Sequence, residues 1–223
     1  MKYIILFVAL PFLVIPAFSQ VSIGVTGGYT LARFHYGHSA NMTNSFNSEW
    51  HAGVIIEKKL AGQFYLQPQL LISREGGKSV YEKYDVEYNY SKIVAHTTYI
   101  ELPMNIVYKF RRWYCGAGPY IARGVGGRFH SETINALPGS YISEYRVMGK
   151  VKFNSKGSGE RYDEWYMRSL DYGLNFIGGY GLTKRLFFNA NYNLGLSGIY
   201  GNGSKVRNRY WGVSVGYFLK RNK

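Results

Sequence analysis

The chain contains only one cysteine, Cys115, which excludes an internal disulfide and a cysteine-based metal cluster. Acidic residues are also few: 13 Asp and Glu stand against 27 Lys and Arg, giving a formal charge of +14. After residue 20, no run of apolar residues is long enough for a membrane-spanning helix. Mean hydropathy is −0.20, so overall hydropathy points to no membrane segment. The informative signal must therefore lie in the spacing of residues.

The first 20 residues have the pattern of a secretory signal peptide. Lys2 precedes an apolar run from Tyr3 to about Ala17, and Ala17-Phe18-Ser19 offers a small-residue cleavage site. The run is shorter than the roughly 20 residues that a membrane helix needs. We expect removal of residues 1–19 or 1–20, leaving residues 21–223 as a single exported domain. No cysteine stands directly after the predicted cleavage site, which argues against a lipid anchor.

Alternation of apolar and polar residues dominates the mature chain. In "LFFNANYNLGL" (186–196), every second residue from Leu186 is apolar, and Asn189, Asn191 and Asn193 lie between them. The same period predicts eight strands, near residues 21–33, 49–60, 63–75, 92–110, 113–126, 166–180, 186–199 and 207–219. The 22 Tyr, 13 Phe and 27 Gly suit strands and turns. The chain is predicted to be all-β.

The predicted connections alternate in length. Short turns, "LAGQ", "FRRW" and "GLTKR", alternate with longer links at 34–48, 76–91, 127–165 and 200–206. This asymmetry is typical of bacterial outer-membrane barrels, in which only alternate residues meet lipid. We therefore expect an eight-stranded antiparallel up-and-down transmembrane β-barrel in the outer membrane. Its short turns and both termini would be periplasmic, and its long loops extracellular.

A soluble exported barrel of the lipocalin type is the alternative. Its water-facing side should be rich in Lys and Glu, whereas here the polar side is mostly Gly, Asn, Ser, Gln and Thr. Aromatic residues also gather at segment ends, as expected for girdles at the two membrane interfaces. The expected girdle residues are Tyr29, Phe64, Tyr108, Phe110, Trp113, Tyr166, Tyr180, Phe187, Tyr217 and Phe218. Both features favour the membrane barrel.

The interior of an eight-stranded barrel is just wide enough for side chains to fill it. We expect a polar network in this lumen, formed by Glu57, Gln67, Gln69, Glu101, Asn105, Lys109, Asp171, Asn175, Asn189 and Asn191. Because buried charges need partners, Lys109 should pair with Glu57 or Glu101, and Asp171 with a loop arginine. A packed internal scaffold is favoured over a narrow polar pore.

The excess of positive charge suggests lipid as a partner. A basic cluster of Lys58, Lys59, Arg111, Arg112, Lys184 and Arg185 lies near the predicted periplasmic turns, where it can meet lipid phosphates. Lys150, Lys152, Lys156 and Arg161 in the third loop could meet lipopolysaccharide. Nucleic acid is not expected as a partner of an exported barrel. No cofactor is expected.

Catalysis is not expected, because the histidines show no pattern with a nucleophile and a carboxylate. They are His35, His38, His51, His96 and His130. His35 and His38 lack further ligands for a metal, so we predict no catalytic, cofactor or metal site. In the last strand, Tyr210, Gly212, Val215 and Tyr217 have the spacing of the signal that barrel-assembly machinery recognises. The tail after Phe218 departs from that pattern by not ending on the aromatic residue.

Two loops carry features of a binding surface. Residues 79–92, "SVYEKYDVEYNYSK", hold four tyrosines, which suit either partner binding or a hairpin continuing the flanking strands. The third loop is too long to be only a connection. Within it, "YISEYRVMGKVKF" could form part of an external hairpin, and "NSKGSGE" a turn.

Several segments resemble a known family in order and motif. They are "SIGVTGGYTLARF", "WHAGVIIEKKLAGQFYLQPQLLIS", "TTYIELPMNIVYKFRRWYCGAGPYI", "LDYGLNFIGGYGLTKRLFFNANYNLGL" and "RYWGVSVGYFL". The chain resembles the PorT-like outer-membrane β-barrel family of Bacteroidota over nearly its whole mature length. The resemblance implies fold and location, and one branch of that family serves type IX secretion. We expect a non-enzymatic barrel whose loops act in envelope structure or bind a protein partner. An accessory role in a type IX-like secretion complex and a narrow passive pore are the alternatives.

Overall fold

The computed structural model describes residues 21–35, 42–84, 88–136, 142–159, 161, 163–201 and 206–221. The predicted signal peptide lies outside these residues, as do His38 and parts of the predicted loops. The described residues form strands, turns and bends. None of them belongs to a helix that is long and apolar enough to cross a membrane.

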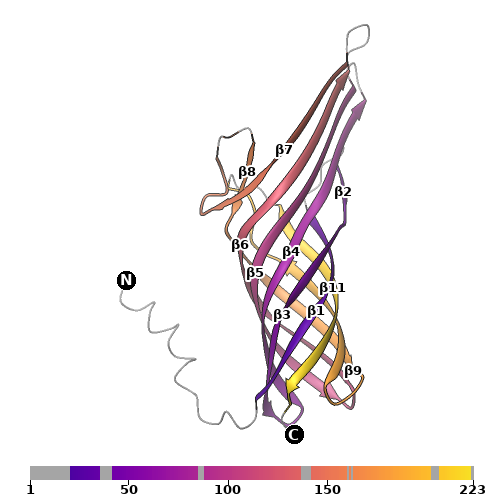
Figure 1. Ribbon diagram of the computed structural model, residues 1–223, viewed down its shortest axis with the longest axis vertical. Helices are drawn as coiled ribbons and strands as arrows, with labels where there is room; N and C mark the ends of the chain where they lie inside the picture. The colour runs from indigo at the N-terminus through magenta and orange to yellow at the C-terminus, as the bar shows by residue number, and fades with distance from the viewer. Residues whose placement is uncertain are drawn as a thin grey trace, which may run out of the picture.

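Eight strands form a closed ring (Figure 1). They are β1 (Val21–His35), β3 (Asn47–Ala61), β4 (Phe64–Tyr84), β5 (Tyr88–Phe110), β6 (Trp113–Ala136), β9 (Leu170–Gly181), β10 (Leu186–Gly195) and β11 (Arg207–Lys220). Each strand pairs antiparallel with the strand before and after it in this order. The ring is closed because β1 pairs with β11, from Ile23 opposite Lys220 to His35 opposite Arg207.

The ring turns its apolar side outward. Along β11, Trp211, Val213 and Val215 are exposed, while Gly212 and Ser214 between them are buried. Successive side chains of a strand point to opposite faces, so this alternation separates an apolar outer face from a polar inner one. A soluble protein shows the opposite arrangement. The outer face is therefore suited to lipid.

All the short turns lie at one end of the ring, which we call the turn end. They are at 62–63, 111–112 and 182–185, and Val21 and Lys220 lie at the same end. The opposite end is called the loop end. Gly62, with φ of +54°, takes the left-handed conformation that suits glycine in a tight turn. Arg111 takes a similar φ of 55° without being glycine.

Part of the ring continues far beyond its loop end. β4, β5 and β6 have 21, 23 and 24 residues, against 12, 10 and 14 in β9, β10 and β11. About 9–11 tilted residues cross a bilayer. The excess forms a tall sheet, which we define as residues 76–84, 88–97, 127–136 and 142–151 (Figure 1).

Three further strands complete the fold. β2 (Met42–Ser45) pairs with β4, and β7 (Ile142–Asn154) pairs with β6 along the tall sheet. β8 (Glu164–Arg168) runs parallel to residues 150–154 of β7. The structure favours the hairpin interpretation of this loop, because residues 80–84 pair with residues 88–92 and continue the flanking strands. In the third loop, residues 142–151 pair with β6, and Gly157 turns the chain with its N–H bonded to Asn154 Oδ1.

Candidate functional site

The inner face of the ring brings the predicted polar network together. Eight of its ten members are buried: Glu57, Gln67, Gln69, Glu101, Asn105, Asp171, Asn175 and Asn189. Lys109 and Asn191 are half-buried. These side chains come from β3, β4, β5, β9 and β10, so strand pairing across the whole ring is needed to assemble them. The lumen is filled by side chains.

Glu101 is the central acceptor of this network. Tyr210 of β11 donates its hydroxyl to Glu101 Oε2, and Asn193 Nδ2 lies 3.4 Å from the same oxygen. Asn193 in turn accepts hydrogen bonds from Asn175 and, at 3.3 Å, from Asn191. One hydrogen-bonded chain therefore ties together β5, β9, β10 and β11. Tyr210 and Asn193 were absent from the predicted network, although both continue the inward phase of their strands.

Asp171 has a different set of partners from the one expected. The Ser197 hydroxyl donates to Oδ1, while Asn208 Nδ2 lies 3.0 Å and Tyr120 Oη 3.4 Å from Oδ2. These neutral donors replace the expected loop arginine. Asp171 is 1% exposed, so an arginine reaching it would have to lose its own water. Hydroxyl and amide groups satisfy the carboxyl group with less desolvation.

Two further buried residues of the lumen, Glu75 and Tyr99, were not predicted from the sequence. Glu75, in the inward phase of Gln67 and Gln69, is 1% exposed, and neither of its carboxyl oxygens has a hydrogen-bond partner among the described residues. Tyr99 is fully buried, with its hydroxyl 3.4 Å from Asn208 Nδ2. Their positions in the inward-facing phase of the strands were the sequence signal that could have identified both residues.

Apolar clusters lie toward both ends of the polar lumen. The turn-end plug consists of Ile55, Val107, Tyr114, Ile177, Phe187 and Phe218. The loop-end cluster consists of Phe34, Ala95, Val151, Met167, Ile199 and Val206, with aromatic side chains packed against it.

The placement of Phe187 and Phe218 corrects the predicted girdle. Both are 3% exposed inside the ring, with ring centroids 4.9 Å apart, so their assignment to the membrane interface was wrong. Phe188 and Tyr217 face outward. Because side chains alternate along a strand, their neighbours Phe187 and Phe218 face inward. Six other predicted girdle aromatics are exposed: Tyr29, Phe64, Tyr108, Phe110, Trp113 and Tyr217. Tyr180 is half-buried, and Tyr166 lies in β8 outside the ring.

A serine and a histidine meet inside the lumen. His51 Nε2 lies 2.6 Å from Ser214 Oγ, and His51 Nδ1 lies 2.8 Å from Thr30 Oγ1. A catalytic triad would place a carboxylate where Thr30 stands. The adjoining cavity has a volume of about 10 Å³, which is room for about one water molecule. The pair therefore has hydrogen-bonding capacity but no space for a substrate. The carboxylate that contacts a histidine, Glu49, lies against His96 instead.

No group of three or more His, Cys, Asp or Glu residues that could hold a metal ion occurs in the described part of the chain.

The four residues of the predicted assembly signal split between the two faces of β11. Tyr210 and Gly212 face the lumen, and Val215 and Tyr217 face outward. Tyr210 thus has a structural role in the lumen, and its role in assembly stays a prediction.

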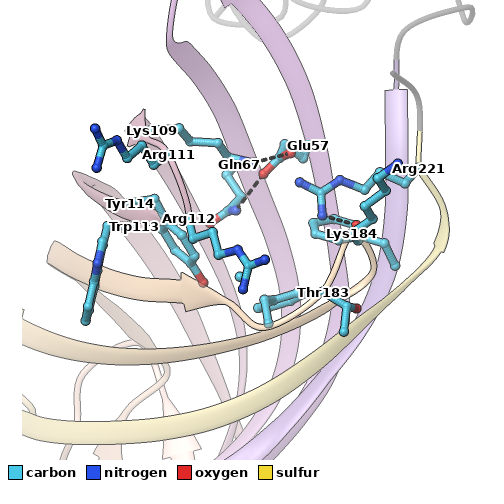
Figure 2. A pocket seen from close by; sticks show the side chains of 13 residues that line it. Glu57, Gln67, Lys109, Arg111, Arg112, Trp113, Tyr114, Thr183, Lys184 and Arg221 are labelled. Carbon is cyan, nitrogen blue, oxygen red and sulfur yellow. Dashed lines mark hydrogen bonds and ion pairs between the residues drawn. The ribbon is translucent and has the colours of Figure 1, made fainter.

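A cavity of about 330 Å³ opens at the turn end, beneath the turn-end plug (Figure 2). Its acidic residue, Glu57, binds Lys109 Nζ at 2.5 Å and Gln67 Nε2 at 3.2 Å. The predicted pair of Glu57 with Lys109 is therefore formed. Lys109 also lies over the Tyr65 ring, with 4.4 Å from Nζ to the centroid.

The predicted basic cluster divides into two groups at this end. Arg111, Arg112 and Lys184 line the cavity, together with Arg221. Lys58, Lys59 and Arg185 do not line it. Arg185 instead reaches the hydroxyl of the outward-facing Tyr217, at 3.4 Å. Contact of these residues with lipid stays a prediction.

Comparison with known families identifies the fold. Residues 17–201 match the family model described as the outer membrane protein beta-barrel domain. The chain belongs to this family. It is an outer-membrane protein, and the eight-stranded antiparallel barrel predicted from the sequence is confirmed. Membership of the PorT-like branch stays a prediction.

Solved structures similar to the chain are distant in sequence. Ail of Yersinia pestis is 10% identical, with 90% of this chain and 99% of that chain covered and a TM-score of 0.38. Neisserial surface protein A is 10% identical, with 89% and 99% covered and a TM-score of 0.38. The outer membrane protease OmpT of Escherichia coli is 11% identical, with 90% and 95% covered and a TM-score of 0.30. No curated protein matches the chain.

Proposed function

We propose that the protein is a non-enzymatic outer-membrane barrel with a closed lumen, which acts by binding a protein partner on its tall sheet. In this orientation the turn end and both termini of the mature chain face the periplasm, and the tall sheet faces outward. The short turns and long hairpins support this orientation, because outer-membrane barrels place short turns in the periplasm.

The free edge of β7 carries the proposal. Residues 142–149 pair with β6 on one side, and no described strand pairs with them on the other. Ile142, Tyr145 and Met148 on this edge are 69%, 57% and 78% exposed. Proteins usually protect such edges, because unpaired backbone groups attract another strand. An extended segment of a partner could add to this edge by backbone hydrogen bonds, and its side chains could pack on the apolar residues.

The geometry gives little support to the narrow pore. The polar middle of the lumen is packed with hydrogen-bonded side chains, and the turn-end plug and loop-end cluster cover it. Catalysis also lacks support, because the Ser214–His51 pair borders a cavity of only about 10 Å³.

An accessory role in a type IX-like secretion complex would use the same edge of β7 and differ only in the identity of the partner. Binding of lipopolysaccharide by the third loop has weaker support. Lys152 lies 3.9 Å from Glu164, and Arg161 lies within 4 Å of both Asp163 and Glu164. Two of its four cations are thus already near carboxylates.

Photo-cross-linking in the native outer membrane tests the proposal. A photoreactive residue is placed at Tyr145 or Met148 on the edge, or at Leu70 on the lipid-facing surface as the matched control. We expect one saturable protein adduct from positions 145 and 148, and none of that mass from position 70. A type IX component in that adduct would identify the accessory role. Absence of adducts from both edge positions would contradict the proposal, as would the same adduct from position 70.

A further inference from the structure

We propose that the turn-end cavity is a binding site for an amphiphilic oxyanion, a molecule with a carboxylate or phosphate head and an apolar body. This site is at the opposite end of the barrel from the tall sheet, so the inference is independent of the proposed function. The cavity volume of about 330 Å³ falls at the lower end of the range for small-molecule sites, about 300–1,000 Å³.

The charges around the cavity are unbalanced. Five cations line it against one carboxylate, Glu57, and Lys109 already binds that carboxylate at 2.5 Å. The other four cations form no ion pair with any described residue: Arg111, Arg112, Lys184 and Arg221. Like charges gathered in one concave place repel each other unless an anion joins them. The cavity is therefore electrostatically suited to an anion.

Two guanidinium groups are aimed at the middle of the cavity. Figure 2 shows Arg112 and Arg221 reaching toward the centre of the mouth from different sides. Arg221 is held in place because it donates to the Lys184 carbonyl and lies 5.2 Å from the centroid of the Phe218 ring. Guanidinium groups bind carboxylate and phosphate with two parallel hydrogen bonds. These two arginines and Lys184 are the proposed ligands of the head group.

Another part of the cavity lining is apolar and aromatic. Tyr114, Phe187 and Phe218 belong to both the turn-end plug and the cavity lining. They offer a surface for the apolar body, while the charged head remains at the mouth. A bare inorganic ion would use only the cations, so the combination of walls selects an amphiphile.

The turn between β5 and β6 places a further cation at the rim of the cavity. Arg111 has a φ of 55° in a two-residue turn, a conformation that favours glycine. Among the described residues it is the only non-glycine residue with a positive φ. Its guanidinium lies over the outward-facing Phe110 ring, 5.5 Å from the centroid, so Arg111 adds positive charge at the rim and is not one of the proposed ligands.

Titration of the purified protein in phosphatidylcholine nanodiscs tests the inference, with octyl phosphate as the probe and inorganic phosphate as the bare ion. We expect saturable one-to-one binding of octyl phosphate and far weaker binding of inorganic phosphate. The double variant R112Q/R221Q should lose at least about tenfold in affinity, since it removes charge-assisted hydrogen bonds. The matched control K58Q/K59Q removes the same charge at the same end, outside the cavity, and should keep the affinity within about twofold.

Heat-dependent mobility on gels verifies that each variant is folded. Equal affinity in the two double variants would overturn the inference, as would a linear, non-saturating uptake of octyl phosphate. A second arm adds phosphatidylglycerol to the nanodiscs. Competition with octyl phosphate in the wild type, absent in R112Q/R221Q, assigns the site to lipid head groups. Unchanged affinity in the presence of that lipid assigns it to a soluble anion. Both results retain the oxyanion site.

Discussion

The strands β4, β5 and β6 run through both the barrel and the tall sheet but meet different surroundings in the two regions. Within the barrel, β4 alternates between lumen and lipid, with Leu70 exposed outward and Gln69 buried inside. Beyond the barrel, the same strand pairs with β5 on one side and, over residues 78–81, with β2 on the other. Near the barrel the tall sheet also packs on the loop-end cluster through Ala95 and Val151, whereas farther out it is stabilised by backbone hydrogen bonds and cross-strand pairs. Stability should therefore reside in the barrel, and the tall sheet should be free to carry a binding surface.

The largest expected effect is in the turn-end plug. Phe187→Ala removes a side chain that is 3% exposed and packed on Phe218, and should lower the free energy of unfolding by about 3–5 kcal/mol. Phe188→Ala, one residue on and facing lipid, should cost clearly less. Urea unfolding in lipid vesicles, followed by tryptophan fluorescence, measures both. Equal losses would show that the assignment of inner and outer faces is wrong.

The next largest effect is expected for a charge placed on an exposed face, which should destabilise the barrel but not the tall sheet. Leu70→Arg places a cation on the lipid-facing surface of β4 and should cost about 2–4 kcal/mol of unfolding free energy. Met148→Arg in the tall sheet, where the side chain is 78% exposed, should change it by no more than about 0.5 kcal/mol. The same unfolding experiment gives both values. A similar cost at the two positions would remove the distinction between lipid-facing and water-facing surface.

A smaller effect is expected in the polar network. Asp171→Asn places an amide donor where Ser197, Asn208 and Tyr120 all donate, so the free energy of unfolding should fall by about 1–3 kcal/mol. Asp163→Asn is the matched change outside the barrel, because its ion pair with Arg161 is exposed. It should have an effect below about 1 kcal/mol. An unchanged free energy of unfolding in Asp171→Asn would indicate that the network contributes little to stability.

The smallest effect concerns the end of the tall sheet. Replacing residues 80–92 by Asn-Gly shortens β4 and β5 together, because Val80 and Lys92 are paired. We expect the unfolding free energy of the barrel to remain nearly unchanged, since the barrel pairs below that rung are kept. A large loss of stability would show that the tall sheet and the barrel unfold as one unit.

The sequence predicted the barrel strands well because their alternation is enforced by lipid on one side and a lumen on the other. It did not predict where β4, β5 and β6 end, because tyrosines and charged residues alternate in the same way beyond the membrane. Phe187 and Phe218 were wrongly assigned to the membrane interface, because the clustering of aromatic residues at strand ends was given more weight than their positions in the inward-facing phase of their strands. The pairing of Lys109 with Glu57 was one of the two alternatives predicted, and the structure selects it over the pairing with Glu101.

The remaining interior contacts depend on pairings that no local pattern reveals. Glu101 and Tyr210 are 109 residues apart, and Asp171 and Asn208 lie on strands that are not neighbours in the ring. The turn-end cavity is a similar case. The basic residues near the turns were recognised, but only the closed ring shows that Arg112 and Lys184 face a cavity while Lys59 and Arg185 do not.

Conductance of the purified wild-type protein in planar lipid bilayers tests most directly whether the lumen is closed and the protein acts through its outer surface. Because the turn-end plug and loop-end cluster cover a packed polar interior, we expect no stable current steps. Reproducible steps whose size changes in Glu101→Gln or Lys109→Gln would contradict this, since ions would then be crossing the polar network itself.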